Sequence, residues 1–217
     1  NLKAKYIDNP YWASYTSYSD ENRDRVYGNA GVEWNIAKGL KATAKVHGDV
    51  YTYSVEDRIA VYSRTTSMYS EKVQRFQEFN YEAMLHYNTA LKNFTLNAFI
   101  GTNLMHQRRN INNGETQGGL IIPEYYNLSN ATSVLTTDKT YRKEIRSLLG
   151  NVSLGWKSML FADATFRNDW SSTLPANENS YFYPSFSGSF IFTELEPVKA
   201  VSWLNFGKVR LGWAQVG

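Results

Sequence analysis

The chain has 217 residues, a formal net charge of +3 and no cysteine, which excludes a disulfide scaffold, a thiol nucleophile and a thiolate metal site. Its lysines and arginines are spread along the sequence and its pI is near 8.9, so we expect no nucleic-acid partner. With 15% aromatic residues and a mean hydropathy of -0.47, it is too aromatic for a disordered chain and too polar for membrane-spanning helices. A transmembrane β-barrel has the hydropathy of a soluble protein, because only every second residue meets lipid.

The first 24 residues are polar and rich in tyrosine, with no sustained period, and they predict a loop. Asn1 is not followed by a signal peptide, and the chain opens in the middle of a pattern. We therefore expect a fragment or a trimmed mature protein.

Apolar and polar residues then alternate with the two-residue period of strands. The first two predicted strands cover about residues 26–36 and 40–50, with a turn at Ala37-Lys38-Gly39. After an irregular stretch at 54–75, the alternation returns at 79–88 and 94–104, across a short connection at 89–93. The first half of the chain thus predicts two hairpins.

The second half repeats this plan. Residues 107–140 are too rich in turn formers for a strand. A long hairpin follows at 148–156 and 160–170, reversing at Lys157-Ser158. After a loop at 171–180 come a strand at 182–192, a connection at 193–205 with a possible helical turn after Pro197, and a strand at 208–213. Eight strands are predicted in all.

Two regularities favour an outer-membrane barrel. Short connections alternate with long ones, as periplasmic turns alternate with external loops in such barrels. One face of the predicted strands also has roughly forty positions and no charge, where chance would place about eight charges. The charged residues of the strands lie on the other face: Glu33, Lys41, Lys45, Asp49, Glu82, Asp163, Arg167, Asp169, Lys208 and Arg210.

Aromatic residues on the apolar face form two bands with small and aliphatic residues between them, as interfacial girdles require. A soluble sandwich would tend to place its largest rings in the middle of its core instead. One band lies beside the short turns: Trp34, Tyr87, Phe94, Trp156 and Phe192. The other lies near the opposite ends of the strands: Phe79, Tyr81, Trp170, Phe182 and Trp213.

No residue pattern points to catalysis or to a metal, and we expect a protein that is not an enzyme and has no cofactor. His47, His86 and His106 are scattered and lack a ligand partner at metal spacing. Asp163 and Asp169 are six strand residues apart, about 20 Å, too far for a glycosidase pair. We expect them to be salt-bridged or solvated charges of a wet interior.

Three segments in the second half of the chain closely resemble the barrel of SusC/RagA-type TonB-dependent transporters. They are NDWSSTLP at 168–175, NSYFYPS at 179–185 and WLNFGKVRLGWAQVG at 203–217. NPYW at 9–12, the strand at 25–40 and IPEYYNLS at 122–129 agree with this resemblance. The match spans nearly the whole chain, and its motifs occur in the family's order.

The resemblance implies an all-β fold, with residues 1–217 forming about eight antiparallel transmembrane strands of a 22-stranded outer-membrane barrel. It implies import of glycans or oligopeptides with a SusD-like surface lipoprotein, energised by the TonB complex through an N-terminal part that this chain does not show. It also implies that the outer surface of the barrel contacts outer-membrane lipid.

Aromatic residues of the predicted loops are the candidate substrate-binding residues, because flat rings offer apolar area with a polar edge. They are Tyr11, Trp12, Tyr62, Tyr69, Tyr125 and Tyr126. The alternative is that they pack the loops against one another or against the lipoprotein.

Two other classes of protein remain open at this stage. One is a complete eight-stranded outer-membrane barrel, an adhesin or structural protein, which must close its first strand against its last. The other is a soluble carbohydrate-binding β-sandwich, in which a second sheet would cover the apolar face.

Overall fold

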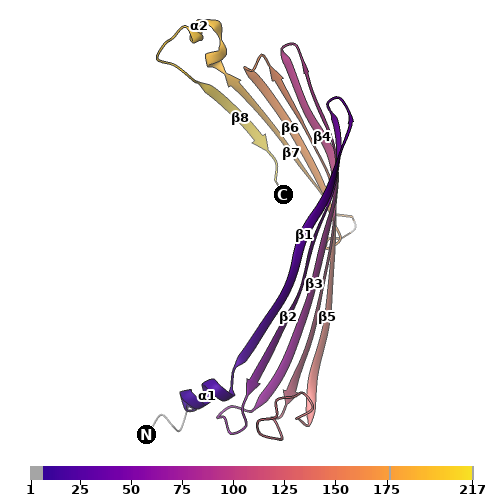
Figure 1. Cartoon of the computed structure of the whole chain (residues 1–217), viewed down its shortest axis with the longest axis vertical. Helices are drawn as coiled ribbons and strands as arrows, with labels where there is room; N and C mark the ends of the chain where they lie inside the picture. The colour runs from indigo at the N-terminus through magenta and orange to yellow at the C-terminus, as the bar shows by residue number, and fades with distance from the viewer. Residues whose placement is uncertain (1–6, 176, 217) are drawn as a thin grey trace. The chain divides into compact units, whose positions relative to one another are not determined.

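The computed structural model describes residues 7–175 and 177–216 as one sheet of eight antiparallel strands (Figure 1). The strands pair in sequence order, from β1 at one edge to β8 at the other. The described part leaves out residues 1–6, 176 and 217. Of these, residues 1–6 and 176 belong to predicted loops. The strands are β1 Ser19–Ala37, β2 Leu40–Ile59, β3 Met68–Leu91, β4 Phe94–Gln117, β5 Ser133–Trp156, β6 Leu160–Ser171, β7 Ser180–Ile191 and β8 Lys208–Ala214. The helices are α1 Pro10–Thr16, the 3-10 turn η2 Phe192–Glu194 and α2 Glu196–Lys199.

The chain divides into two compact units, and five of the strands run through both. The loop-bearing unit comprises the chain up to Tyr27, Gly48–Glu78 and Gln107–Arg142. The turn-bearing unit comprises Gly28–His47, Phe79–His106 and the chain from Lys143 onward.

Tight turns in the turn-bearing unit join the strands where the sequence predicts them. Lys157 and Ser158 have φ of 50° and 57°, the left-handed pair that matches the twist of a two-stranded ribbon. Gly39 has φ +78°, and a Cβ there would lie 2.2 Å from the Asn88 carbonyl oxygen. The Asn88 amide donates to the Gly39 carbonyl at 2.7 Å, so this turn requires glycine for both its dihedral and its close contact.

The register of β5 to β8 puts the apolar residues on one face. Val152 pairs with Ala164, Ala164 with Phe186, and Phe186 with Trp213. One residue along, Ser153 pairs with Asp163, which pairs with Ser187. Because neighbouring partners share a face, the predicted division into a charge-free face and a polar face is confirmed here.

Nothing in the described part of the chain covers the apolar face. The buried apolar residues of that part are only Ala60, Tyr69 and Leu120, whereas large residues of the apolar face stay exposed, with Val152 at 44% and Leu211 at 76%. A soluble sandwich would bury this face under a second sheet. The described residues form a single sheet with β1 and β8 at its edges, so by themselves they make neither the two-sheet sandwich nor the closed eight-stranded barrel.

The strands are longer than the alternation predicts. Strands β2 to β5 reach Ile59, Met68, Gln117 and Ser133, well inside the predicted irregular stretches at 54–75 and 107–140. There both faces of the strands are polar, so the alternation vanishes while backbone pairing continues. In consequence Phe79 and Tyr81 lie in the middle of β3 rather than near its end, although Trp170, Phe182 and Trp213 do lie near strand ends.

Two smaller differences concern chain segments next to strands. Residues 10–16 form α1 where a loop was expected, and β1 already begins at Ser19. Phe192 is in η2 rather than in the seventh strand, with its ring against Gly207, where an added Cβ would lie 2.1 Å from it. The predicted helical turn near Pro197 is confirmed as α2. None of the helices in the described residues is long and apolar enough to cross a membrane.

Candidate functional site

The loop-bearing unit gathers three chain segments at the ends of its strands. Helix α1 follows Asn9, whose side chain accepts a hydrogen bond from the Tyr11 amide at 3.0 Å, and Pro10 supplies the preset first helical position. Asp8 then binds the loop between β2 and β3: its carboxylate accepts from the Ser63 hydroxyl and from the Arg64 amide at 3.0 Å. The helix is thus held against residues 60–67.

Arg58 at the end of β2 connects α1 to the loop between β4 and β5. Its guanidinium carbon lies 3.9 Å from the ring centre of Tyr18 and 4.9 Å from that of Tyr126, a cation between two aromatic rings. The Tyr126 hydroxyl donates to the Thr16 carbonyl at 3.0 Å. Figure 1 shows α1 and the connections after β2 and β4 at the same end of this unit.

Asparagines order the long loop at 118–132 from within. The Asn130 side chain is buried; it accepts from the Ile122 amide at 2.9 Å and donates to the Ile122 and Tyr125 carbonyls at 2.8 and 2.6 Å. Asn127 accepts from both the amide and the hydroxyl of Ser129. These bonds give polar groups of the loop the partners that a strand would otherwise supply.

The six predicted aromatic residues separate into two groups. Tyr11, Tyr62 and Tyr125 are exposed, at 81%, 83% and 47%. Trp12 and Tyr126 are half-buried, and Tyr69 is buried. The structure thus brings all six into one unit but leaves only the first three open to a ligand or a partner.

Tyr69 and Tyr126 instead hold the loops. The Tyr69 hydroxyl donates to the Glu71 carboxylate at 2.7 Å, and burial followed by this bond raises the pKa of Tyr69. The Tyr69 amide donates to the Thr116 hydroxyl of β4 at 2.9 Å. Burial also raises the pKa of Tyr126. These contacts are the kind that the packing interpretation describes.

Sequence analysis missed Arg58, Tyr18 and Asp8 as organising residues of this end. Their partners are distant in sequence: Arg58 lies at the end of β2, and Tyr126 lies in the loop between β4 and β5. Because no short-range spacing marks such pairs, only pairing of the strands brings them together.

The polar face of the turn-bearing unit carries ordered charges. Asp163 accepts from the hydroxyls of Ser153 and Ser187, one on each neighbouring strand, at 3.4 Å for Ser187. Arg167 forms an ion pair with Asp169 at 2.8 Å. Asp169 is thus salt-bridged, as one form of the prediction has it, whereas Asp163 is bound by two hydroxyls, which the prediction of salt-bridged or solvated charges did not include.

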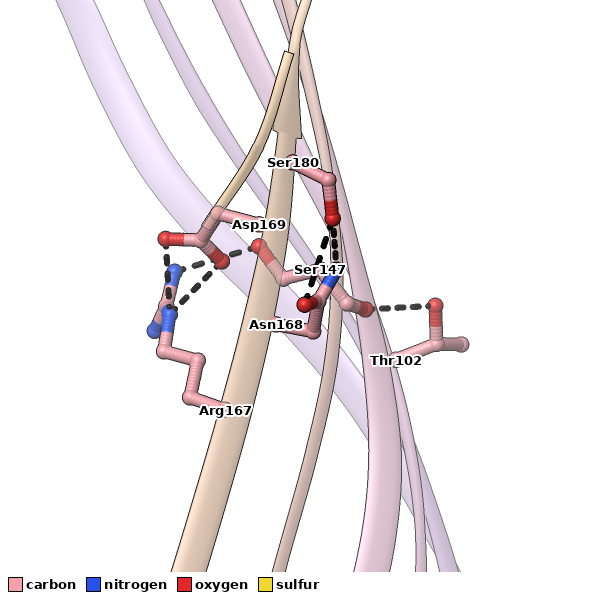
Figure 2. A network of polar contacts seen from close by, with 6 residues as sticks. All are labelled: Thr102, Ser147, Arg167, Asn168, Asp169 and Ser180. Atoms are coloured by element: carbon pink, nitrogen blue, oxygen red, sulfur yellow. Dashed lines mark hydrogen bonds and ion pairs between the residues drawn. The ribbon is translucent and has the colours of Figure 1, made fainter. Parts of the chain in front are cut away.

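Polar contacts on both faces of the sheet cross four strands of this unit (Figure 2). Ser147, Arg167 and Asp169 lie on the polar face, whereas Asn168 pairs with Leu148 and Phe182 of the apolar face. Arg167 of β6 points toward Asp169 and also donates to the buried Ser147 hydroxyl of β5 at 3.1 Å, while the Thr102 hydroxyl of β4 donates to the Ser147 carbonyl at 3.0 Å. Asn168 donates to the Ser180 hydroxyl of β7 at 2.9 Å. These bonds satisfy the hydroxyl and the carbonyl of the buried Ser147 and link side chains across the sheet.

Two of the three histidines have local partners. His86 lies 3.4 Å from the Thr43 hydroxyl, and His106 lies 3.2 Å from the Glu144 carboxylate. Within residues 7–175 and 177–216, no group of three His, Asp or Glu side chains has the geometry of a metal site.

Comparison with solved structures identifies the architecture: the chain has the fold of a segment of a transporter's barrel wall. It matches a chain in a structure of the RagAB peptide transporter with a TM-score of 0.82 and 16% identity over 94% of this chain. Structures of the RagAB peptide importer in its open-open and closed-closed states match with TM-scores of 0.84 and 0.82, each at 16% identity over 94% of this chain. At this identity the likeness establishes the fold alone, and the expected all-β fold of about eight antiparallel strands is confirmed.

The chain spans about a quarter of the solved chains, 24% of the first and 23% of the other two. No protein-family model matches the sequence, and no curated protein matches it either. The similar solved chains are described as transporters and importers, not as enzymes.

Proposed function

We propose that this chain is part of the wall of an outer-membrane, TonB-dependent importer of the SusC/RagA type. The observation that carries the proposal is an uncovered, charge-free face across sequentially paired strands, in a fold shared with RagAB over 94% of the chain. In this proposal the apolar face contacts outer-membrane lipid, the polar face lines a wet path, and the remaining strands, the plug and the TonB contact belong to the rest of the protein.

The exposed loop residues support a second part of the proposal. Tyr11, Tyr62 and Tyr125, with Ile121 and Ile122, are exposed on segments that the Asp8 and Arg58 contacts hold in place. Rigid aromatic and aliphatic side chains are the usual contacts of protein and ligand recognition. We assign this surface to a SusD-like lipoprotein or to the substrate. Peptides are the first substrates to test, because the similar solved chains are described as peptide importers, and glycans are the alternative.

Cysteine labelling of the intact protein tests the placement of the two faces, because this chain contains no cysteine of its own. In a cysteine-free background, Asn151→Cys on the polar face should react with a water-soluble maleimide in outer-membrane vesicles. Val152→Cys, the next residue, should be protected there and should react only after the vesicles are dissolved and the protein is unfolded. Equal labelling of both positions in intact vesicles contradicts the membrane placement.

Uptake tests the substrate class. A host that lacks the intact protein should lose growth on peptides as a sole nitrogen source, and the wild-type gene should restore it. Loss of growth on a polysaccharide with normal growth on peptides would select the glycan alternative, and normal growth on both would contradict the importer proposal.

A further inference from the structure

Two hollows on the apolar face of the turn-bearing unit share residues. The first has a volume of about 510 Å³ and crosses strands β1 to β5. The second has a volume of about 660 Å³ and lies between β4, β5, β6 and the loop after β6. Thr102 and Leu148 line both. The two hollows therefore adjoin at these two residues.

The first hollow is an apolar groove whose shape follows from residue size. Its floor includes Ala42, Ala44 and Ala83, where side chains are short, and larger residues stand along it. The larger side chains are Val32, Trp34, Leu85, Ile100 and Leu148. The hollow therefore offers the apolar surface that an acyl chain needs.

The second hollow is polar and lies where the charge-free face ends. Arg146 pairs with Trp170 across β5 and β6, next to the Leu148 pair, and it is the first charged residue of β5 beyond the apolar positions. Its Nε donates to Glu144 at 2.6 Å, and 72% of its side chain is exposed. Glu144 also lies 3.2 Å from His106 Nδ1. One carboxylate thus stands between two basic side chains, with an exposed guanidinium beside an aromatic ring.

Backbone bonds hold this polar hollow in shape. The Glu144 amide donates to the Ser172 hydroxyl at 2.8 Å, and the Ser172 amide donates to the Glu144 carbonyl at 2.9 Å. The Ser171 amide donates to the Asn179 carbonyl at 2.9 Å. The loop after β6 is thereby fastened to β5, and the hollow exists before any ligand arrives.

We infer that these two hollows are one binding site for a membrane lipid with an anionic phosphate headgroup. Its acyl chain lies in the groove over Ala42, Ala44 and Ala83, and its phosphate contacts Arg146 beside Trp170. The order of the two hollows indicates the occupant. The first is apolar, like a lipid tail, and the second is polar, like a lipid headgroup, and they meet where the charge-free face ends. Arginine is suited to phosphate because its planar fork gives two parallel hydrogen bonds. The inference rests on the proposed placement of this face in a bilayer.

The test is native mass spectrometry of the intact barrel protein in detergent micelles with phosphatidylglycerol added. We expect one retained lipid per wild-type protein. Arg146→Gln removes the phosphate contact and Ala44→Leu fills the groove, and each should weaken retention about tenfold or more. The matched control is Ala164→Leu, the same change on the same face but outside both hollows, which should retain lipid as wild type does. Arg146→Lys, which keeps charge without the fork, should fall between wild type and Arg146→Gln.

Several outcomes would overturn the inference. They are wild-type retention in both Arg146→Gln and Ala44→Leu, equal loss in Ala164→Leu, and displacement of the lipid by inorganic phosphate alone at matched concentration. Each variant is first checked for folding by the heat-dependent shift of the barrel on gels and for recovery in outer-membrane fractions. A protein that fails to enter the membrane contradicts the proposed function, whereas an inserted barrel without selective lipid retention contradicts only this site.

Discussion

The same strands are built differently in the two units of the molecule. In the turn-bearing unit, β3 alternates from Phe79 to Tyr87 between apolar and polar residues, whereas from Met68 to Glu78 in the loop-bearing unit it carries Glu, Lys, Gln and Arg among its residues. Backbone pairing continues through both. The difference teaches that side-chain alternation reports the solvent on each face, while the strand itself needs only neighbours to pair with.

The largest effect should come from a charge in the alternating part. Val152→Arg places a guanidinium on the apolar face of β5, and we expect a loss of about 2 to 4 kcal/mol in folding free energy in lipid vesicles, as for cations at mid-bilayer. Thr136→Arg is the matched control, because Thr136 is exposed on the same strand within the loop-bearing unit. We expect it to change stability by less than about 0.5 kcal/mol. Similar losses for both variants would erase the distinction between the two units.

The contacts of Arg58 with Tyr18 and Tyr126 should stabilise the loops without contributing to the stability of the strands. Arg58→Met removes the cation between Tyr18 and Tyr126, at a cost of about 1 to 2 kcal/mol to local loop order. Limited proteolysis should then cut within residues 118–132 faster, with the unfolding temperature of the barrel unchanged. Tyr62→Ala, at an exposed position in the neighbouring loop, serves as a control that should leave this cleavage rate as in wild type.

The pH dependence of the same loop follows from the raised pKa of Tyr126. Its neutral form is favoured in the folded loop, so the stabilisation is fully present below the ordinary tyrosine pKa of about 10 and is lost as pH rises through the higher folded value. Cleavage at 118–132 should accelerate on going from pH 9 to above that value. In Tyr126→Phe the cleavage rate should not rise with pH in this way, because the variant has no hydroxyl to ionise. A rise of unchanged size in the variant would show that another group causes it.

The exposed tyrosines should separate from the packed ones in a partner assay. Tyr125→Ala should weaken capture of the surface lipoprotein or uptake of substrate about tenfold, the scale of a residue worth more than about 1 kcal/mol at an interface, and leave proteolysis of the loop unchanged. Tyr69→Ala should accelerate proteolysis of the loop and leave capture and uptake nearly unchanged, because Tyr69 is buried against Thr116 and Glu71. Identical behaviour of the two variants would contradict the division of the aromatic residues into contact and packing groups.

The smallest effect concerns a turn. Lys157→Asn with Ser158→Gly places the preferred residues at two positions with positive φ, and we expect a gain of about 0.5 to 1 kcal/mol. Equilibrium urea unfolding in vesicles measures it. A loss of stability would mean that the contact of Lys157 with the Trp156 ring, at 4.9 Å, outweighs the turn preference.

The sequence predicted the strands well wherever one face is apolar and the other polar. The hairpin through Lys157-Ser158 and the face shared by Val152, Ala164 and Phe186 appear as expected. The prediction failed at the extensions of β2 to β5, since segments that are polar on both faces carry no period. It also failed at Phe192, which η2 removes from the strand.

The sequence by itself determined the number of strands, their order of pairing through short turns, and which side chains share a face, because these depend on neighbours along the chain. Only the tertiary structure decided which aromatic residues are exposed and which hold the loops. Tyr126 and Tyr125 are adjacent in the sequence, yet one lies on Arg58 and the other on the surface. The reason is physical: Arg58 comes to Tyr126 through lateral strand pairing, which joins residues far apart in the chain and leaves no local spacing to detect.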